Sequence, residues 1–123
     1  MIHFDANFLV AALAENTDAA ALLDGWVEKG DEVAISTVAY AEFLCGPLSA
    51  DAETESDSLF PEPIPLIPQD AKKAAELFNA TGRRSRSLSD CLIAATAIRL
   101  GASLATYDRD DFVRFAAHGP RLL

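Results

Sequence analysis

The sequence contains little of what would mark a secreted, membrane or zinc-binding protein. It has two cysteines, Cys45 and Cys91, each in an apolar helical pattern, so we expect two reduced core thiols and no disulfide framework. No apolar run approaches the roughly 20 residues that a membrane span requires. The first residues lack the basic segment and apolar stretch of a secretory signal. His3 and His118 have no partner at a spacing typical of zinc sites or catalysis. We therefore expect a cytoplasmic protein with no membrane segment.

Basic residues are almost absent from the first part of the chain. Residues 1–71 contain 14 acidic residues and one basic residue, Lys29, whereas residues 72–123 contain five acidic and nine basic residues. The net charge is −9, but this asymmetry is a mild indication that the second part faces a polyanion. Chance clustering together with charges at helix ends is the simpler explanation when charge is considered alone.

Short apolar segments alternate with helical patterns, and half of the 123 residues are hydrophobic. The expected strands are residues 2–5, 32–36 and 103–106. The expected helices are residues 7–14, 17–29 with Thr17 as N-cap and Gly30 as the stop, 37–45 with Thr37 as N-cap, 70–80, a helix from Ser87 or Ser89 to Leu100, and a last turn over 111–115. No hairpin dipeptide separates the strands, so the pattern predicts an α/β sandwich in three layers with a central, mostly parallel sheet. We expect one domain over residues 1–123.

Three further segments have distinct compositions. Residues 91–98 are apolar nearly all round, which is typical of a central, buried helix. Residues 49–58 are acidic and rich in serine, so we expect a mobile loop there. Residues 64–67 lie among prolines and are compatible with a short edge strand, since proline is excluded from central strands.

Four acidic residues stand near the ends of these elements. Asp5 ends the first strand, Glu42 lies about one turn into the helix after the second strand, Asp90 begins the buried helix, and Asp108 follows the last strand. In an open parallel sheet the ligand site lies outside the carboxyl ends of the strands. We therefore expect these four carboxylates to converge at that edge.

Converging carboxylates need either protons or a cation. Two unit charges about 4 Å apart repel by about 4 kcal/mol at an effective dielectric constant of about 20. Either some pKa values rise, or divalent cations occupy the cluster. Ligand sets made only of oxygen suit Mg²⁺ or Mn²⁺ rather than zinc. A pair of such ions held by carboxylates can activate water and stabilise both oxygens of an in-line phosphoryl displacement, so the pattern points to a metal site.

Each acidic residue also has a purely structural explanation. Asp90 is compatible with an N-cap or first-turn role, Glu42 with a solvated helical face, and Asp5 with capping of the next turn together with Asn7. Together, at the ends of the elements of one sheet, these residues favour a shared site. Spacing does not select among the three aspartates near the end of the chain: Asp108, Asp110 and Asp111.

The acidic residues lie in four short segments: Phe4-Asp5-Ala6-Asn7, Ala41-Glu42-Phe43, residues 89–95 (Ser-Asp-Cys-Leu-Ile-Ala-Ala) and residues 106–112 (Thr-Tyr-Asp-Arg-Asp-Asp-Phe). With these segments, in this order, the chain resembles the PIN domain, and more narrowly the VapC-type ribonuclease toxins of prokaryotic toxin–antitoxin pairs. The resemblance covers almost the whole chain. It implies a PIN-like fold and a Mg²⁺- or Mn²⁺-dependent endoribonuclease that acts on structured RNA such as tRNA. It also implies a homodimer and a small cognate antitoxin.

The resemblance further implies individual roles. Catalysis and metal binding would fall to four acidic residues, with a fifth assisting: Asp5, Glu42, Asp90 and Asp108, with Asp111. Thr106 would orient a carboxylate through its hydroxyl group, and Asn7 would orient the turn after the first strand. Two departures stand out. Ala6 replaces a frequent Thr or Ser, and residues 49–63 lack the pattern of the helical arm found in many relatives.

Three arginines shortly before Asp90 are candidates for binding the phosphates of RNA: Arg83, Arg84 and Arg86. A solvated basic loop is the alternative explanation. Two other functions are compatible with the same fold, namely a catalytically inert PIN-fold module that binds RNA or protein, and a housekeeping nuclease without an antitoxin. The inert module predicts missing acidic residues, whereas all four positions are acidic. An aspartate-nucleophile phosphatase needs a second aspartate where this chain has Asn7.

Overall fold

The structure is a computed structural model that describes residues 1–123. Three short apolar strands, and a fourth strand near the end of the chain, form its centre. The strands are β1 Ile2–Phe4, β2 Val33–Ile35, β3 Ser103–Ala105 and β4 Arg121–Leu122. They form one sheet in the order β2-β1-β3-β4, and every neighbouring pair is parallel. Phe4 is opposite both Ile35 and Ala105, so the first three strands end at the same level. The sequence motifs that follow them therefore emerge at one edge.

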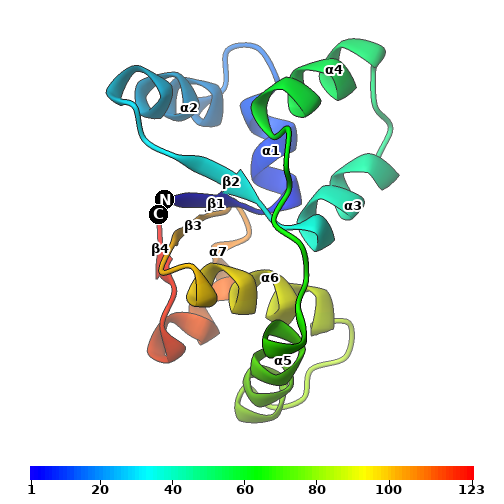
Figure 1. Cartoon of the computed structure of the whole chain (residues 1–123), viewed down its shortest axis with the longest axis vertical. Helices are drawn as coiled ribbons and strands as arrows, with labels where there is room; N and C mark the ends of the chain where they lie inside the picture. The colour runs from blue at the N-terminus through cyan, green and yellow to red at the C-terminus, as the bar shows by residue number, and fades with distance from the viewer.

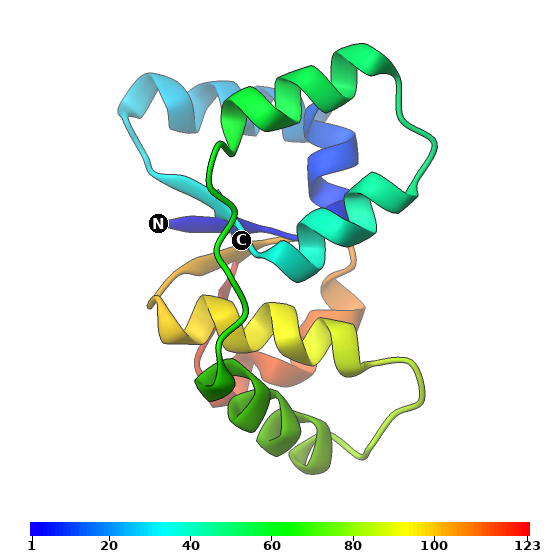
Figure 2. The same cartoon turned by 45° about the vertical axis from the view of Figure 1, so that its right-hand side comes forward.

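Helices cover both faces of this sheet (Figures 1 and 2). Above it, as drawn, lie α1 Ala6–Ala12, α2 Asp18–Lys29, α3 Thr37–Cys45 and α4 Ala50–Leu59. Below it lie α5 Pro68–Ala80, α6 Leu88–Arg99, α7 Arg109–Phe112 and the 3₁₀ helix Val113–His118. None of the helices is long and apolar enough to cross a membrane. The predicted α/β sandwich of three layers around a parallel sheet is confirmed.

Local capping explains where several helices begin and end. The Thr17 hydroxyl accepts a hydrogen bond from the Ala20 N–H at 3.0 Å, and Gly30 ends α2 with φ +78°, both as predicted. The N-cap of α3 is Ser36 rather than the predicted Thr37. Ser36 Oγ accepts from the Ala39 N–H at 3.1 Å, so the serine satisfies a free donor of the first turn and Thr37 becomes the first helical residue.

The core forms where aromatic residues of β1 and α1 meet the upper helices. The Phe4 ring lies 4.9 Å from the ring of Phe8 and 5.4 Å from that of Phe60, measured between centroids. Helix α6 is buried along most of its length, which confirms the prediction from its apolar pattern. The prediction of two core thiols is wrong for Cys45, which is exposed, and confirmed for Cys91, which is buried.

The predicted mobile loop over residues 49–58 is wrong, because Ser49 caps helix α4 and the helix covers Ala50–Leu59. Ser49 Oγ accepts from the Ala52 N–H at 3.0 Å, and Asp51 in the first turn interacts favourably with the helix dipole. The Tyr40 hydroxyl of α3 donates to Asp57 and ties the two helices together. An acidic composition therefore does not prevent a helix here, because capping and contact with α3 hold it.

The predicted edge strand over residues 64–67 is reduced to a single parallel bridge between Ile64 and Ser36. The Ile64 N–H donates to the Ile35 carbonyl at 2.8 Å, and the Thr37 N–H donates to the Ile64 carbonyl at 2.9 Å. Proline on both sides of Ile64 leaves no further donor to extend the ladder. Strand β4 was not predicted, and it pairs with β3 over two residues, Arg121 and Leu122.

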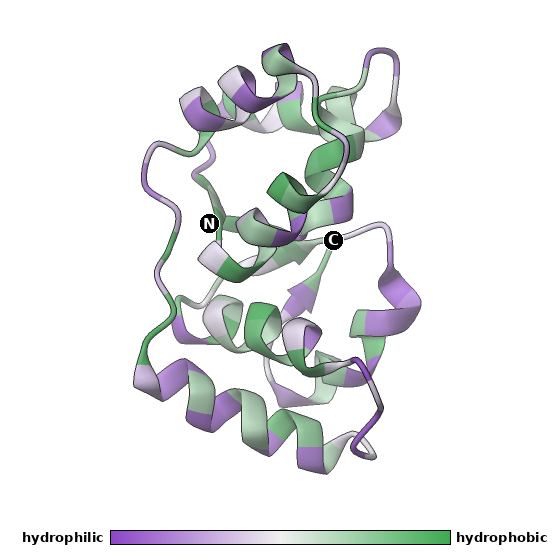
Figure 3. Cartoon of the chain, turned by 90° about the vertical axis from the view of Figure 1, so that its right-hand side faces the viewer, coloured by the Kyte–Doolittle hydropathy of each residue, from purple (hydrophilic) through white to green (hydrophobic).

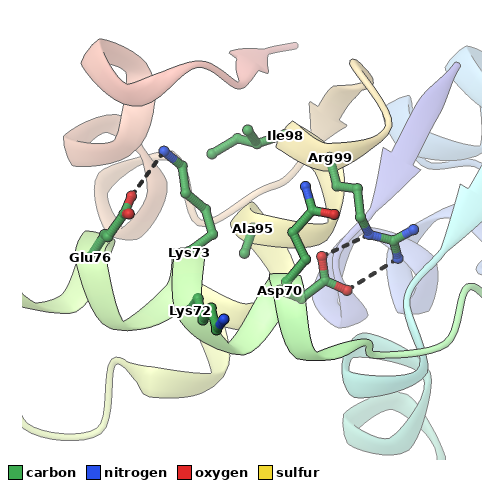
Figure 4. Close-up of a pocket in the computed structure, with 8 residues that line it drawn as sticks. Asp70, Lys72, Lys73, Glu76, Ala95, Ile98 and Arg99 are labelled. Carbon is green, nitrogen blue, oxygen red and sulfur yellow. Dashed lines mark hydrogen bonds and ion pairs between the residues drawn. The ribbon is translucent and has the colours of Figure 1, made fainter.

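A buried ion pair joins α5 to α6 on the lower side of the sheet (Figure 4). Arg99 donates from Nε to Asp70 Oδ1 at 2.8 Å and from Nη2 to Asp70 Oδ2 at 3.1 Å, and Asp70 is fully buried. Asp70 Oδ2 also accepts from the Ile67 N–H at 3.1 Å. A pocket of about 430 Å³ lies beside this pair, and Lys73 and Glu76 on its rim form a salt bridge at 3.2 Å. Both carboxylates that line this pocket, Asp70 and Glu76, are therefore already paired with a basic side chain. We interpret the pocket as a structural feature of the packing between α5 and α6.

His3 of β1 is buried, whereas His118 is exposed. Neither ring nitrogen of His3 has a hydrogen-bond partner. Burial and, next, the nearby Arg99 charge lower the pKa of His3 from 6.5 to about 4. His3 is therefore a neutral, packed side chain of the core.

Substituting Asp70→Asn should lower the free energy of unfolding by about 3 kcal/mol, because it leaves the Arg99 charge largely buried without its partner. Glu76→Gln is the matched control. It breaks an exposed pair on the same helix and should change stability by less than about 0.5 kcal/mol. Urea denaturation of the three proteins measures both values. Equal stability of Asp70→Asn and Glu76→Gln would contradict the structural role of the buried pair.

Candidate active site

The aligned strand ends bring four carboxylates to one cavity. The cavity has a volume of about 200 Å³ and is lined by residues from the carboxyl edge of the sheet. Figure 3 shows the backbone from the side of this edge. Its walls come from the turn after β1, from α3, from the start of α6 and from the segment after β3. The residues that line it are Asp5, Ala6, Asn7, Glu42, Asp90, Ile93, Asp108 and Phe112. The structure thus brings together the four acidic side chains expected at this edge.

Asp5 is the most buried of these acids, with 3 % of its surface exposed. It is the N-cap of α1, where Oδ1 accepts from the Phe8 N–H at 2.7 Å, and Oδ2 accepts from the Thr106 hydroxyl. Burial raises the pKa of Asp5 from 3.8 to about 6, and the charges of Asp108 and Asp90 raise it further, while the two hydrogen bonds oppose the shift. Asp5 is therefore held rigidly in a setting that disfavours its charge.

Thr106 and Asn7 link Asp5 to Asp108. The Thr106 hydroxyl donates to Asp5 and accepts from the Asp108 N–H at 2.9 Å. The Asn7 side-chain amide donates to the Asp108 carboxylate. These contacts connect the turn after β1 with the segment after β3, and they fix the relative positions of the two carboxylates.

Glu42 of α3 and Asp90 of α6 also line the cavity. The pKa of Glu42 is raised by burial and then by the charges of Asp90 and Asp5, while a hydrogen bond with Ser89 opposes the rise. The pKa of Asp90 is raised by burial and then by the charge of Asp111. Three of the four acids thus have raised pKa values, chiefly because they are buried and secondarily because other carboxylates lie nearby.

Asp110 and Asp111 are exposed and do not line this cavity. Together with Tyr107, Asp108 and Arg109 they line a second pocket of about 340 Å³, which shares only Asp108 with the cavity. Asp111 still affects the site, because its charge raises the pKa of Asp90. Asp108 is the one aspartate of this cluster that contributes directly to the cavity.

The three predicted RNA-binding arginines lie in the loop between α5 and α6, just before Asp90. Arg83 is turned back onto α5, with its guanidinium 5.2 Å from the centre of the Phe78 ring and a hydrogen bond to Asn79. Arg84 and Arg86 are exposed and form no salt bridge. The loop therefore offers two free guanidinium groups rather than three.

The sequence prediction did not include Arg114. Its Nη2 lies 3.7 Å from Asp90 Oδ2, and its guanidinium stacks on the Phe115 ring at 4.5 Å from the centroid. The sequence gives only a weak indication that Arg114 belongs to the site. Arg114 is a basic residue three positions after Asp111, in the last helical turn, and nothing in the sequence pairs it with α6.

Comparison with known proteins agrees with this geometry. The model of the PIN domain family matches residues 2–118. The chain belongs to the PIN domain family. No curated protein matches the sequence.

Solved structures share the fold of this PIN domain at low sequence identity. FitAcB from Neisseria gonorrhoeae is 23% identical with a TM-score of 0.74, and the match covers 100% of this chain and 97% of that chain. VapBC2 from Rickettsia felis, bound to a DNA fragment from its promoter, is 22% identical with a TM-score of 0.76, covering 100% and 98%. VapBC-1 from nontypeable Haemophilus influenzae is 20% identical with a TM-score of 0.72, covering 100% and 97%.

The donor set of this PIN domain fits a hard divalent cation. The charged groups that line the cavity are all carboxylates, and Mg²⁺ and Mn²⁺ prefer such oxygen ligands. No three His, Cys, Asp or Glu side chains are arranged around one point closely enough to hold an ion. Burial, and next to it the charges of neighbouring carboxylates, raise the pKa values of Asp5, Glu42 and Asp90, and a bound cation would favour their charged forms.

The pKa of Asp5 links stability to pH. Because folding raises this pKa from 3.8 to about 6, the folded state holds the proton more tightly. The resulting stabilisation is fully present below the unfolded pKa and is lost as pH rises through about 6. A shift of about two units corresponds to at most about 3 kcal/mol. In EDTA, the free energy of unfolding of the wild type minus that of Asp5→Asn should fall by about 2 kcal/mol between about pH 4.5 and about pH 7.5.

Denaturant unfolding at the two pH values measures this difference. Asp110→Asn, an exposed aspartate outside the cavity, is the matched control. If the difference in the free energy of unfolding between the wild type and Asp5→Asn is the same at both pH values, the pKa of Asp5 is not raised by burial in the folded state.

Proposed function

We propose that this PIN domain is a Mg²⁺- or Mn²⁺-dependent endoribonuclease and the toxin of a toxin–antitoxin pair. The observation that carries the proposal is the single cavity lined by four carboxylates at the carboxyl edge of the sheet. Membership of the PIN domain family supports a nuclease. The toxin role is supported by the structural neighbours, which include a toxin–antitoxin complex from Klebsiella pneumoniae with a TM-score of 0.73.

The cation would be held by Asp5, Glu42, Asp90 and Asp108, with Asp111 assisting from outside the cavity. When bound, such an ion lowers the pKa of a water molecule and stabilises the charge that develops on a phosphate. The chain's own groups position the ligands. The Phe8 N–H and the Thr106 hydroxyl fix the two oxygens of Asp5, and the Asn7 amide fixes the Asp108 carboxylate.

RNA is the proposed substrate, with structured RNA such as tRNA as the first class to test. Four carboxylates repel a polyanion unless a cation lies between them, so binding energy must come from outside the cavity. Arg84 and Arg86 are exposed and unpaired just before α6, whose first turn contains Asp90. We propose that they bind the phosphates that flank the scissile bond.

A small cognate antitoxin and a second copy of the chain are the proposed partners. An apolar groove of about 340 Å³ between α1, α3 and α4 supports a protein partner. Val10 on its wall is 54% exposed, and Leu13, Phe43 and Leu48 also line it. Exposed apolar surface of this kind is typical of protein interaction sites.

A catalytically inert PIN-fold module that binds RNA or protein is the second candidate. The observation that favours it is that no three acidic side chains are arranged around one point. The two candidates differ in one respect, since an inert module binds its partner without cutting RNA in any cation.

The deciding experiment is cleavage of total tRNA and of a single-stranded RNA by the purified protein in Mn²⁺, in Mg²⁺ and in EDTA. We expect cleavage with either ion and none in EDTA. Asp5→Asn should reduce the rate by more than the roughly 100-fold that loss of an outer-shell partner causes, because it removes a direct ligand.

Asp110→Asn is the matched control and should cut at nearly the wild-type rate, because Asp110 lies outside the cavity. Circular dichroism confirms that each variant is folded. Cleavage that persists in EDTA, or that survives Asp5→Asn, would refute the proposed site. Absence of cleavage of every RNA tested, with RNA still bound, would favour the inert module.

Arg84→Ala should weaken RNA binding and reduce the slope of log K against log salt by about 0.7 to 0.9, the value for one phosphate contact. Binding is measured in the Asp5→Asn background so that the RNA stays intact. Lys72→Ala, an exposed cation on α5, is the control. If Arg84→Ala and Lys72→Ala have the same slope as the parent, the arginine loop does not contact the RNA backbone.

A further inference from the structure

Arg114 lies behind the acidic cavity and does not line it. It projects from the 3₁₀ helix Val113–His118 toward the first turn of α6. Its guanidinium stacks on Phe115, and its side chain is 11% exposed. The nearest carboxylate oxygen is Asp90 Oδ2, at 3.7 Å from Nη2. A positive charge is therefore held close to one carboxylate of the proposed metal site.

The hydrogen bonding of Arg114 is incomplete. Its Nε and Nη2 are buried and have no hydrogen-bond partner, and the distance to Asp90 is longer than a hydrogen bond. A buried guanidinium normally forms close, bidentate pairs, as Arg99 does with Asp70. Arg114 thus contributes a charge more than a set of hydrogen bonds. That charge opposes the effect of Asp111 and Asp108, which raise the pKa of Asp90.

We propose that Arg114 is an internal counter-ion of the carboxylate cluster, which stabilises the cation-free protein and weakens the binding of the divalent cation. The inference rests on the proposed function, because it takes Asp90 as one of the ligands. A fixed positive charge beside a ligand repels an incoming cation, and it offsets the repulsion among the carboxylates when the cation is absent. Arg114 acts through Asp90, and we assign it no contact with the RNA.

The test compares the wild type with Arg114→Met, which keeps an unbranched side chain over Phe115 and removes the charge. Arg114→Lys restores the charge. Arg121→Met is the matched control, because Arg121 is exposed and lies opposite Ser103, at the amino end of β3 and away from the site. Mn²⁺ binding is measured by calorimetry at low ionic strength, and thermal unfolding is measured in EDTA and in saturating Mn²⁺.

Arg114→Met should bind Mn²⁺ about tenfold more tightly than the wild type, because the repulsion between two cations is removed. It should also melt at a lower temperature in EDTA, and saturating Mn²⁺ should close most of this gap. Arg114→Lys should resemble the wild type in both measurements, and Arg121→Met should change neither. A purely structural role would lower the melting temperature without any gain in affinity.

Unchanged or weaker Mn²⁺ binding by Arg114→Met would overturn the inference, even if its stability falls. If Arg114→Met does not fold, Arg114→Gln removes the same charge, retains a donor for Asp90 and is judged by the same affinity criterion. Failure of the wild type to bind Mn²⁺ would overturn the proposed metal site and this inference together. Mn²⁺ binding by the wild type with no effect of Arg114 would overturn this inference alone.

Discussion

Repulsion among carboxylates gathered at one end of a parallel sheet is the constraint on which the rest of the structure depends. Parallel pairing with both neighbours brings the end of β1 level with the ends of β2 and β3, so the polar residues that follow must share one edge. Burial then raises the pKa of Asp5 to about 6. Hydrogen bonds from the Phe8 N–H and Thr106 hold that carboxylate in place although its charge is disfavoured. Stability has to come from elsewhere, chiefly from the aromatic core around Phe4.

Two pairs of arginine and aspartate show how the same chemistry serves different purposes. Asp70 and Arg99 are joined by two close hydrogen bonds, and Asp70 also accepts from a backbone N–H, so this pair is satisfied and braces α5 against α6. Asp90 and Arg114 are 3.7 Å apart, with donors left over. Most buried donors are satisfied, so the free donors of Arg114 need an explanation, and the position of Arg114 beside a proposed ligand supplies one. The larger pocket beside Asp70 is therefore structural, and the smaller one beside Asp90 is the candidate site.

Much of this arrangement could be predicted from local sequence. The elements that could not be predicted are those that rely on contacts with residues distant in the sequence. Thr17 and Gly30 bound α2 as predicted because capping is local. Helix α4 was missed because its contact with Tyr40 comes from another helix. Strand β4 was missed because it is two residues long and is defined by pairing with β3. Arg114 was missed for the same reason, since its link to Asp90 exists only after α6 and the 3₁₀ helix have packed.

The most direct test of the account is the anomalous scattering of Mn²⁺ in crystals of the protein soaked with that ion. We expect an anomalous peak inside the cavity, within direct coordination distance of carboxylate oxygens that include those of Asp5 and Asp90. Peaks confined to surface carboxylates such as Asp110, with none in the cavity, would contradict it. In that case the four converging acids would be a structural feature of the fold and not a metal centre.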